Sequence, residues 1–262
     1  MNIKEVLCAL DSFAPLPLQE DYDNAGLQIG LTEAEVSGAL LCLDVTEATV
    51  DEALNRGCNL IISHHPLIFH KLRRVADEDY VQRTVRKAII NNVGIISMHT
   101  NLDAVEGGVN FEIARRMGLG KIRLLGRRKE VVGRNGADGI IGELPEAIAA
   151  DDLVEMMHKS FDVECVQCNQ LLRHAIKTVA VCGGAGSFLL SDAVRAGADA
   201  FVTGEMHYHE FFGYEQKIQI CVIGHYQSEQ FTPELLASVL GKAVPGLRCE
   251  ISDINTNPIL YL

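Results

Sequence analysis

Short apolar runs that end in titratable side chains constrain the fold of this chain more than any other feature. One such run, Asn59-Leu60-Ile61-Ile62, is preceded by Gly57 and followed by Ser63-His64-His65-Pro66. Its length and its flanking residues predict a buried strand. Open α/β sheets bind ligands at the carboxyl ends of their strands, so both imidazoles would lie where such sheets place a ligand. For this motif alone, a pair of half-exposed surface histidines is the alternative.

Two further apolar runs have the same kind of ending. Residues 94–98 lead into His99-Thr100-Asn101-Leu102-Asp103, and residues 218–224 lead into His225-Tyr226-Gln227-Ser228-Glu229. His225 and Glu229 are four residues apart, so one helical turn would place both on the same face. Three strands that each present histidine or carboxylate at their ends favour one shared site over unrelated surface residues.

The segments between these runs predict a parallel sheet. A strand is expected at 39–43, Thr46 suits the N-cap of a helix that runs to Asn55, and a second helix is expected at 79–91. This β-α-β order implies parallel pairing. We therefore predict that roughly the first 120 residues form a doubly wound unit whose crevice holds the ligand clusters.

A change of composition near 123–129 predicts a domain boundary. Short alternating stretches with glycines suggest hairpins there, and a helix at 152–161 with strands around 163–167 and 175–182 continues a second unit. Arg127, Arg128 and Lys129 could contact phosphate, but a solvated loop is the favoured interpretation. The predicted domains are residues 1–125 with 222–262, and residues 126–221.

Two polar segments of the second unit also follow strands. Cys182-Gly183-Gly184-Ala185-Gly186-Ser187 has the position of a phosphate-cradling loop. Leu189 stands where the dinucleotide fingerprint needs its last glycine, so a tight turn is favoured. A strand expected at 197–202 ends in Thr203-Gly204-Glu205-Met206-His207-Tyr208-His209-Glu210, which is a fourth cluster of titratable groups.

The last helix is expected at about 233–242. Thr232 suits its N-cap, and Pro233 suits the first helical position. In that case a separate turn carries His225 and Glu229. The alternative is one continuous helix that is kinked at Pro233.

Composition narrows the class of protein. The chain has 262 residues, 48% of them apolar, which is enough for one large or two ordinary domains. A net charge of −12 argues against a general nucleic-acid or anionic-membrane surface. The sequence lacks an apolar run of membrane-spanning length, and the first residues do not resemble a signal peptide. We therefore predict a cytoplasmic protein.

Eight cysteines are scattered along the chain. In a reducing compartment most of them should be small buried hydrophobic residues. Cys165 and Cys168 form a C-x-x-C motif, but no second pair accompanies them and no helix is expected to begin there. A zinc or redox role for this motif is not favoured.

His64, His65, Asp103, His225 and Glu229 together offer three imidazoles and two carboxylates. A single ion could not use all five and remain open, whereas two ions could if Glu229 or Asp103 bridges them. Two divalent cations and two carboxylates leave a local charge of about +2, which would hold an anion and activate water. Mixed nitrogen and oxygen donors without thiolate suit zinc, manganese, iron, cobalt or nickel.

Other polar residues near the strand ends are weaker candidates. His99, Glu205 and His209 could orient the ligands or transfer protons, with hydrogen-bonded structural residues as the alternative. The weak candidates for substrate binding are Asp23, Asn24, Gly184 and Ser187.

Five motifs, taken together, resemble the Nif-three-like family, whose bacterial members are often labelled GTP cyclohydrolase class one, type two homologues. They are Asp23-Asn24-x-Gly26-Leu27-x-x-Gly30, Ser63-His64-His65-Pro66, His99-Thr100-Asn101-Leu102-Asp103, Thr203-Gly204-Glu205 and Gly224-His225-Tyr226-x-x-Glu229. These motifs span essentially the whole chain, and their combination is far more specific than any one of them.

The resemblance implies an α/β fold with two α/β domains of three-layer type, the first closed by the C-terminal segment, around a dinuclear metal site. The ligands it implies are the five already named, with Glu229 touching both ions. It also implies ring-like homohexamers and the family's short form, without an inserted middle domain. One departure is that Tyr208 and His209 stand where the family usually has His-His, so a role for the first of that pair is not carried over.

The best single prediction is a hydrolase that depends on two divalent ions and opens the ring of a GTP-like nucleotide. One alternative is a metal-dependent phosphohydrolase, in which the same ions would clamp an in-line displacement. Another is a non-enzymatic regulatory or assembly protein that metals stabilise. The expected partners are a small anionic substrate, with GTP as a candidate, and further copies of the chain. Nucleic acid is not expected, because the net charge of −12 opposes polynucleotide binding, and neither is a membrane.

Overall fold

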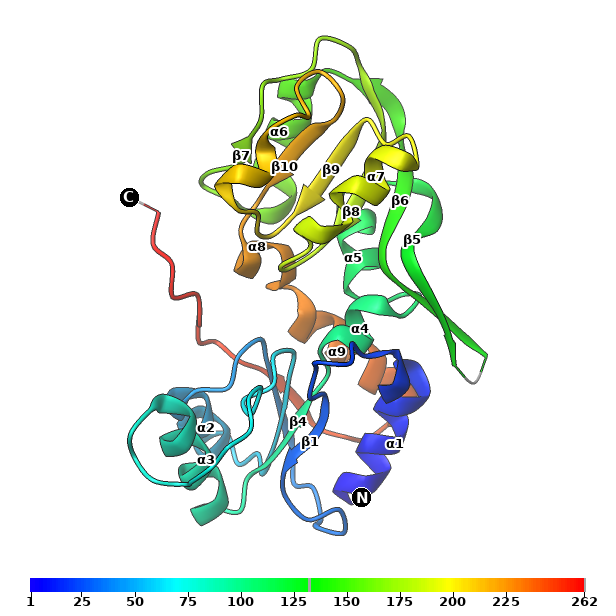
Figure 1. The fold of residues 1–262 in the computed structure, drawn as a ribbon. Helices are drawn as coiled ribbons and strands as arrows, with labels where there is room; N and C mark the ends of the chain where they lie inside the picture. Colours follow the sequence, from blue (N-terminus) through cyan, green and yellow to red (C-terminus); the bar gives the residue numbers. More distant parts are fainter. Residues whose placement is uncertain (132, 262) are drawn as a thin grey trace. The chain divides into compact units, whose positions relative to one another are not determined.

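The computed structural model describes residues 1–131 and 133–261, which divide into two compact units (Figure 1). Unit 1 comprises Met1–Leu102 and Phe231–Pro258, and unit 2 comprises Asp103–Gln230 and the residues from Ile259 onward. Each unit has its own sheet, so the predicted α/β class is confirmed. In the described residues no helix has the length and apolar character that crossing a membrane requires.

These units differ from the predicted domain boundaries at 125/126 and 221/222. Residues 103–125 belong to unit 2, because α5 (Val109–Arg116) packs on β6 (Arg134–Ile148) and β8 (Ile176–Cys182). Residues 222–230 also belong to unit 2, whereas residues 231–258 return to unit 1.

A five-stranded sheet forms the middle of unit 1, in the order β1-β4-β3-β2-β11. The four strands β2 (Ala39–Cys42), β3 (Leu60–Ser63), β4 (Gly94–Ser97) and β11 (Cys249–Ile251) are parallel, and β1 (Gly26–Ile29) pairs antiparallel with β4. Every residue of β2, β3 and β4 is buried. Such continuous burial is typical of a parallel sheet that is covered on both faces.

Helices cover both faces of this sheet (Figure 1). α1 (Ile3–Phe13) and α9 (Thr232–Ala243) pack together, as do α2 (Glu47–Asn55) and α3 (Tyr80–Ile90). Asn2, Thr46 and Asp79 cap the N-termini of α1, α2 and α3 with their side chains, as the sequence predicts for Thr46. A short 3-10 turn, η1 (Leu16–Leu18), follows α1, and α4 (Thr100–Ala104) follows β4.

A six-stranded sheet forms the middle of unit 2, in the order β5-β6-β8-β9-β10-β7. β5 (Gly120–Val131) and β6 form an antiparallel hairpin, as the glycine-rich stretch predicts. β8, β9 (Ala200–Thr203) and β10 (Gln219–Val222) are parallel. The carboxyl ends of these three strands therefore lie at one edge of the sheet.

Two predictions for unit 2 are wrong. The strand expected at 163–167 is absent except for its last residue, because the described strand there is β7 (Gln167–Cys168), a two-residue edge strand on β10. Arg127, Arg128 and Lys129 lie within β5 rather than in a loop. Pairing with β6 extends the strand through these residues, which local composition could not indicate.

The helices of unit 2 are α5, α6 (Ala150–Phe161), α7 (Leu190–Arg195) and α8 (His225–Glu229), with 3-10 turns η2 (Ser187–Leu189) and η3 (Tyr208–Phe211). α7 and α6 lie on opposite faces of the sheet (Figure 1). Phe201, Ala180 and Ile220 on one face share a core with Leu190 and Ala193 of α7.

The open question about Pro233 is decided in favour of two helices. α8 ends at Glu229 and α9 begins at Thr232, so a separate turn carries His225 and Glu229. Thr232 is not the N-cap as predicted, because Phe231 occupies that position with helical dihedral angles (φ −88°, ψ 0°). Pro233 lies in the first turn of α9, where its missing N–H has no helical partner to lose.

Candidate metal centre

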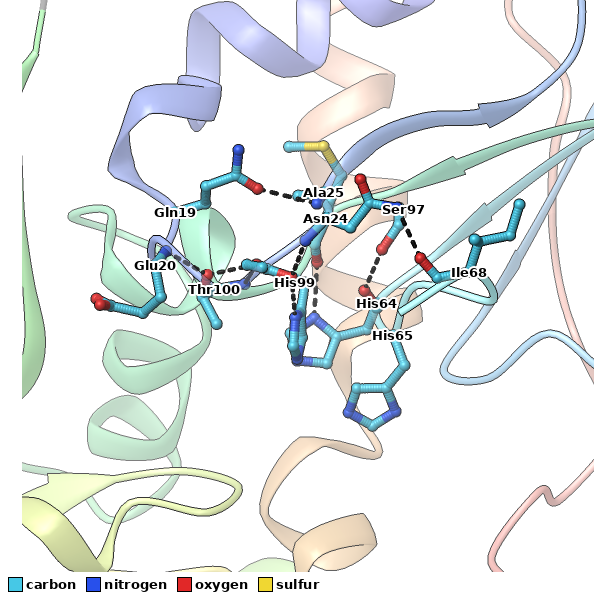
Figure 2. Close-up of polar contacts among 12 residues, drawn as sticks. Gln19, Glu20, Asn24, Ala25, His64, His65, Ile68, Ser97, His99 and Thr100 are labelled. Carbon is cyan, nitrogen blue, oxygen red and sulfur yellow. Dashed lines mark hydrogen bonds and ion pairs between the residues drawn. The ribbon is translucent and has the colours of Figure 1, made fainter. Parts of the chain in front are cut away.

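Three histidines gather at the carboxyl ends of β3 and β4 in unit 1 (Figure 2). The ring centroids of His64 and His65 are 4.9 Å apart, and the His99 ring is 5.4 Å and 5.5 Å from them. β3 and β4 are adjacent and parallel, so their ends present these rings at the same edge of the sheet. His64 is fully buried. The predicted meeting of the first two clusters is therefore observed for the imidazoles.

Each of these three rings uses Nδ1 to contact an oxygen atom. A carbonyl or an ionised carboxylate can only accept a hydrogen bond, so Nδ1 carries the proton and the lone pair of the neutral ring lies on Nε2. Metal-binding histidines are typically oriented in this way by a hydrogen bond from the other ring nitrogen. The acceptors are the Met98 carbonyl oxygen for His64, Asp44 Oδ1 for His65 and Asp23 Oδ1 for His99, each at 2.7 Å.

The two carboxylates of these pairs are held in the charged form. Burial alone would raise the pKa of Asp23, but the hydrogen bond and charge of His99, with a hydrogen bond from Thr100, lower that pKa to about 2. Burial also acts to raise the pKa of Asp44, and hydrogen bonding and charge from His65 outweigh it, so the pKa lies below its ordinary value. Both groups therefore act as fixed anions beside the imidazoles.

The polar loop before β1 packs beside the histidines (Figure 2). Asp23, a weak substrate candidate from the sequence, also accepts hydrogen bonds from the backbone N–H and the hydroxyl of Thr100. Asn24, the second such candidate, donates from Nδ2 to the carbonyl oxygen of Ile68 at 2.6 Å. Both side chains thus hold the loop and the His99 ring in place.

In unit 2, His225 lies between two carboxylates. Its Nδ1 is 2.9 Å from Glu205 Oε1, and its Nε2 is 3.2 Å from Glu229 Oε2. A neutral imidazole has a single N–H and can donate to only one of them. The second contact needs either a protonated ring or a cation between Nε2 and Glu229. If Nδ1 donates its hydrogen bond to Glu205, the lone pair of Nε2 and the Glu229 carboxylate are two ligand atoms suited to a divalent ion.

Two glycines let the backbone approach Glu229 and α8 closely. Gly184 has φ +56°, and a Cβ added to it would lie against Glu229 Oε1, far inside van der Waals contact. A Cβ on Gly204 would lie 2.6 Å from the Gly184 carbonyl oxygen. Ser228 Oγ accepts from the Gly184 N–H at 3.0 Å and donates to the His225 carbonyl oxygen at 2.8 Å. The turn at 183–187 therefore supports α8 directly.

Asp103 and Glu229 both act on one buried thiol. Burial raises the pKa of Cys182 well above its ordinary value, and the charges of Asp103, Asp138 and Glu229 raise it further. Cys182 is therefore a neutral thiol, and this agrees with a donor set of nitrogen and oxygen. The Asp103 carbonyl oxygen accepts from Asn110 Nδ2 at 3.1 Å, which anchors the end of α4.

The remaining candidates lie apart from these contacts. His209 is exposed in η3, and its described ring contacts are with Tyr208 and Phe212. Ser187 donates from Oγ to Glu210 Oε1 at 3.1 Å.

The cysteines of the C-x-x-C motif do not face each other as a pair. Cys168 Sγ lies 3.9 Å from Cys221 Sγ on the neighbouring strand, whereas Cys165 is exposed. All the cysteines are free thiols.

Two functional side chains and one backbone group were missed at the level of sequence. Asp44 and Ser228 orient ligand candidates with their side chains, whereas the Met98 carbonyl belongs to the backbone and has no sequence signature at all. Asp44 could have been found, because it follows strand β2 just as the histidines follow β3 and β4. By donor type, His64 and His65 of unit 1 and Glu229 of unit 2 could each serve as a ligand to a metal ion. Nε2 and carboxylate oxygen together suit the divalent ions expected from the sequence.

Comparisons with known proteins agree with these features. Residues 1–258 match the family model described as Duf34/NIF3 (NGG1p interacting factor 3). A Clostridium acetobutylicum protein named GTP cyclohydrolase 1 type 2 homolog is 31% identical over 230 residues, covering 87% of this chain and 85% of its own length. A Campylobacter jejuni protein of the same name is 28% identical and is covered fully, as is this chain. The crystal structure of Staphylococcus aureus protein SA1388 superposes with a TM-score of 0.90 at 27% identity, covering 100% of this chain and 99% of that one.

Proposed function

The chain belongs to the Duf34/NIF3 family, and from this premise we propose that it is a hydrolase of a nucleotide-like substrate that depends on two divalent metal ions. The observation that carries the proposal is the group of three histidines whose Nδ1 atoms all contact oxygen acceptors. A cluster with a purely structural role has no need of three Nε2 lone pairs beside one another. The proposed ligands of zinc, manganese, iron, cobalt or nickel are His64, His65, Asp103, His225 and Glu229.

Bound ions of this kind polarise a substrate, hold its anionic groups and activate water. The chain's own residues prepare the site for them. Asp44 and the Met98 carbonyl keep two rings in the tautomer that binds metal, and Glu205 does the same for His225. In each case the oriented ring presents the lone pair of Nε2 to a metal ion.

His99 is the proposed proton acceptor. Its ring lies beside His64 and His65, and its Nδ1 proton is held by the Asp23 carboxylate. Such a ring can take a proton at Nε2 from attacking water, and the neighbouring carboxylate stabilises the imidazolium that results. This pairing gives His99 a role different from that of the metal ligands.

Ring opening of a GTP-like purine is the reaction we propose first. It is supported by the names of the curated relatives, which describe them as homologues of a GTP cyclohydrolase. Hydrolysis at C8 would open the five-membered ring of the base. Cytoplasmic location and assembly into a homohexamer are also proposed; sedimentation of the purified chain would test the hexamer.

A hydrolysis screen tests this function. Full-length protein loaded with each ion in turn is incubated with nucleoside triphosphates and simple phosphoesters, and ring opening is recorded separately from phosphate release. We expect ring opening of GTP that is lost in chelator, lost in His64→Ala and retained in His209→Ala. Phosphate release alone would instead assign a phosphohydrolase. Absence of turnover with every ion would refute the enzyme and favour a metal-stabilised regulatory or assembly protein.

Metal analysis tests the bridging role of Glu229. Wild-type protein should bind close to two ions per chain. Because a bridging carboxylate serves both, Glu229→Ala should lose most of both ions, while His65→Ala should weaken one more than the other. Full occupancy in Glu229→Ala would contradict the bridge.

A further inference from the structure

A cavity of about 350 Å³ opens at the carboxyl ends of β8, β9 and β10, within unit 2. These strands are parallel, and open α/β sheets bind their ligands at this edge. Small-molecule sites have volumes of roughly 300–1,000 Å³, so the cavity can take part of a small ligand. His225 and Glu205 belong to its lining, so the cavity adjoins His225, which is one of the proposed metal ligands.

The lining is chemically unlike a phosphate site. Met206, Val222 and Ile259 contribute apolar surface, and neutral polar groups come from Gln167 and Tyr261. None of the described residues that line the cavity is Lys or Arg. A phosphate inside it would be placed near the Glu205 carboxylate without a strongly basic partner, which is unfavourable for a desolvated anion.

Glu205 supplies one strong acceptor at this cavity. Its Oε1 contacts His225 Nδ1, while among the described residues no hydrogen bond to Oε2 is formed. The side chain is 54% exposed, so Oε2 is accessible to a ligand. A hydrogen bond from a ligand N–H to an ionised carboxylate is stronger than one between neutral groups. The cavity therefore favours a ligand group that is flat, uncharged and a donor of N–H.

We propose that this cavity binds the base of the substrate, a purine-type ring, with an N–H donated to Glu205 Oε2 and the ring faces against Met206 and Tyr261. The inference rests on the proposed function, because it names which end of the nucleotide-like substrate this part of the site receives. The phosphate groups lie outside the cavity. The substrate is thus recognised by its base in a pocket whose described lining contains neither Lys nor Arg, and by its anionic part elsewhere.

Binding without turnover tests the assignment. Guanosine, ribose 5-phosphate and inorganic phosphate are titrated into full-length protein in chelator, and the heat of binding is measured. Guanosine should bind and the two phosphates should not. Ala185→Phe, at an exposed position of the lining, should abolish binding by filling the cavity. Glu205→Gln should weaken binding more than about tenfold, because it removes a charged acceptor.

The matched control is Ala196→Phe, at another exposed alanine of unit 2 that lies outside the lining, and this variant should bind guanosine as the wild type does. Circular dichroism verifies that each variant is folded. Binding of phosphate but not guanosine, or equal guanosine affinity in Ala185→Phe and wild type, overturns the assignment. If guanosine binds but no metal-loaded form shows turnover, the proposed hydrolase function is refuted and the assignment of the cavity to the base is supported. If Ala185→Phe shows turnover with an unchanged KM, the assignment of the cavity is refuted and the proposed hydrolase function is supported.

Discussion

Replacement of Gly184 by alanine tests how the backbone positions Glu229. Gly184 has φ +56°, and an added Cβ would lie against the Glu229 carboxylate. That carboxylate is 4% exposed and contacts His225, so it cannot simply swing into solvent. Gly197 provides the control, because it has a similar φ of +77° and no atom within 4 Å of the added Cβ.

The two substitutions should differ by the cost of moving Glu229. A left-handed backbone costs an alanine roughly 1–2 kcal/mol, and both variants carry this cost. In Gly184→Ala the carboxylate must also leave its rotamer, at about 0.5–1.5 kcal/mol, and weaken its polar contact with His225, at about 1 kcal/mol. We therefore expect the free energy of unfolding to fall by about 3 kcal/mol in Gly184→Ala and by about 1–2 kcal/mol in Gly197→Ala.

Urea unfolding measures these losses, with ellipticity as the signal because the chain contains no tryptophan. Metal analysis of the same samples gives a second measure, since displacement of Glu229 should lower metal content only in Gly184→Ala. Equal destabilisation of the two variants, together with unchanged metal content, would show that the Gly184 backbone does not position Glu229.

Two further predictions concern the carboxylates that hold the histidines. Folding lowers the pKa of Asp23 from 3.8 to about 2. Its pair with His99 therefore stabilises the fold above about pH 4, and this stabilisation is lost as the pH falls through about 2. The contribution to the free energy of unfolding is at most about 2 kcal/mol after solvent screening. Asp23→Asn should therefore be less stable than wild type near pH 5 and lose less on acidification in urea titrations, and identical pH profiles would contradict this. Asp44→Asn removes the charged acceptor of His65 and should lower metal affinity about 10–100-fold in calorimetric titrations, whereas the exposed control Asp21→Asn should not; equal affinities would exclude this orienting role.

Local sequence determined much of the scaffold. The apolar runs at 59–62 and 94–98, with glycine and helix caps between them, specify buried parallel strands, because the burial of such runs and the capping of helix ends depend on nearby residues. Since parallel strands end at one edge, the positions of His64, His65 and His99 relative to one another also followed from sequence. The separate helical turn with His225 and Glu229 was one of two alternatives that the signal at Pro233 allowed.

Tertiary structure decided the partners of these residues and the limits of the units. Asp44 contacts His65, and Asp23 contacts His99 across 76 positions of the chain. The strand ends can indicate that Asp44 lies near the histidines, but no local pattern encodes which ring each carboxylate holds. The β5 strand continues through Arg127–Lys129 because β6 pairs with it, and α5 joins unit 2 because its apolar side packs on β6 and β8. Hydrogen bonds and packing between distant segments set these features. A sequence therefore indicates which side chains can do chemistry, and the fold determines what holds each of them in place.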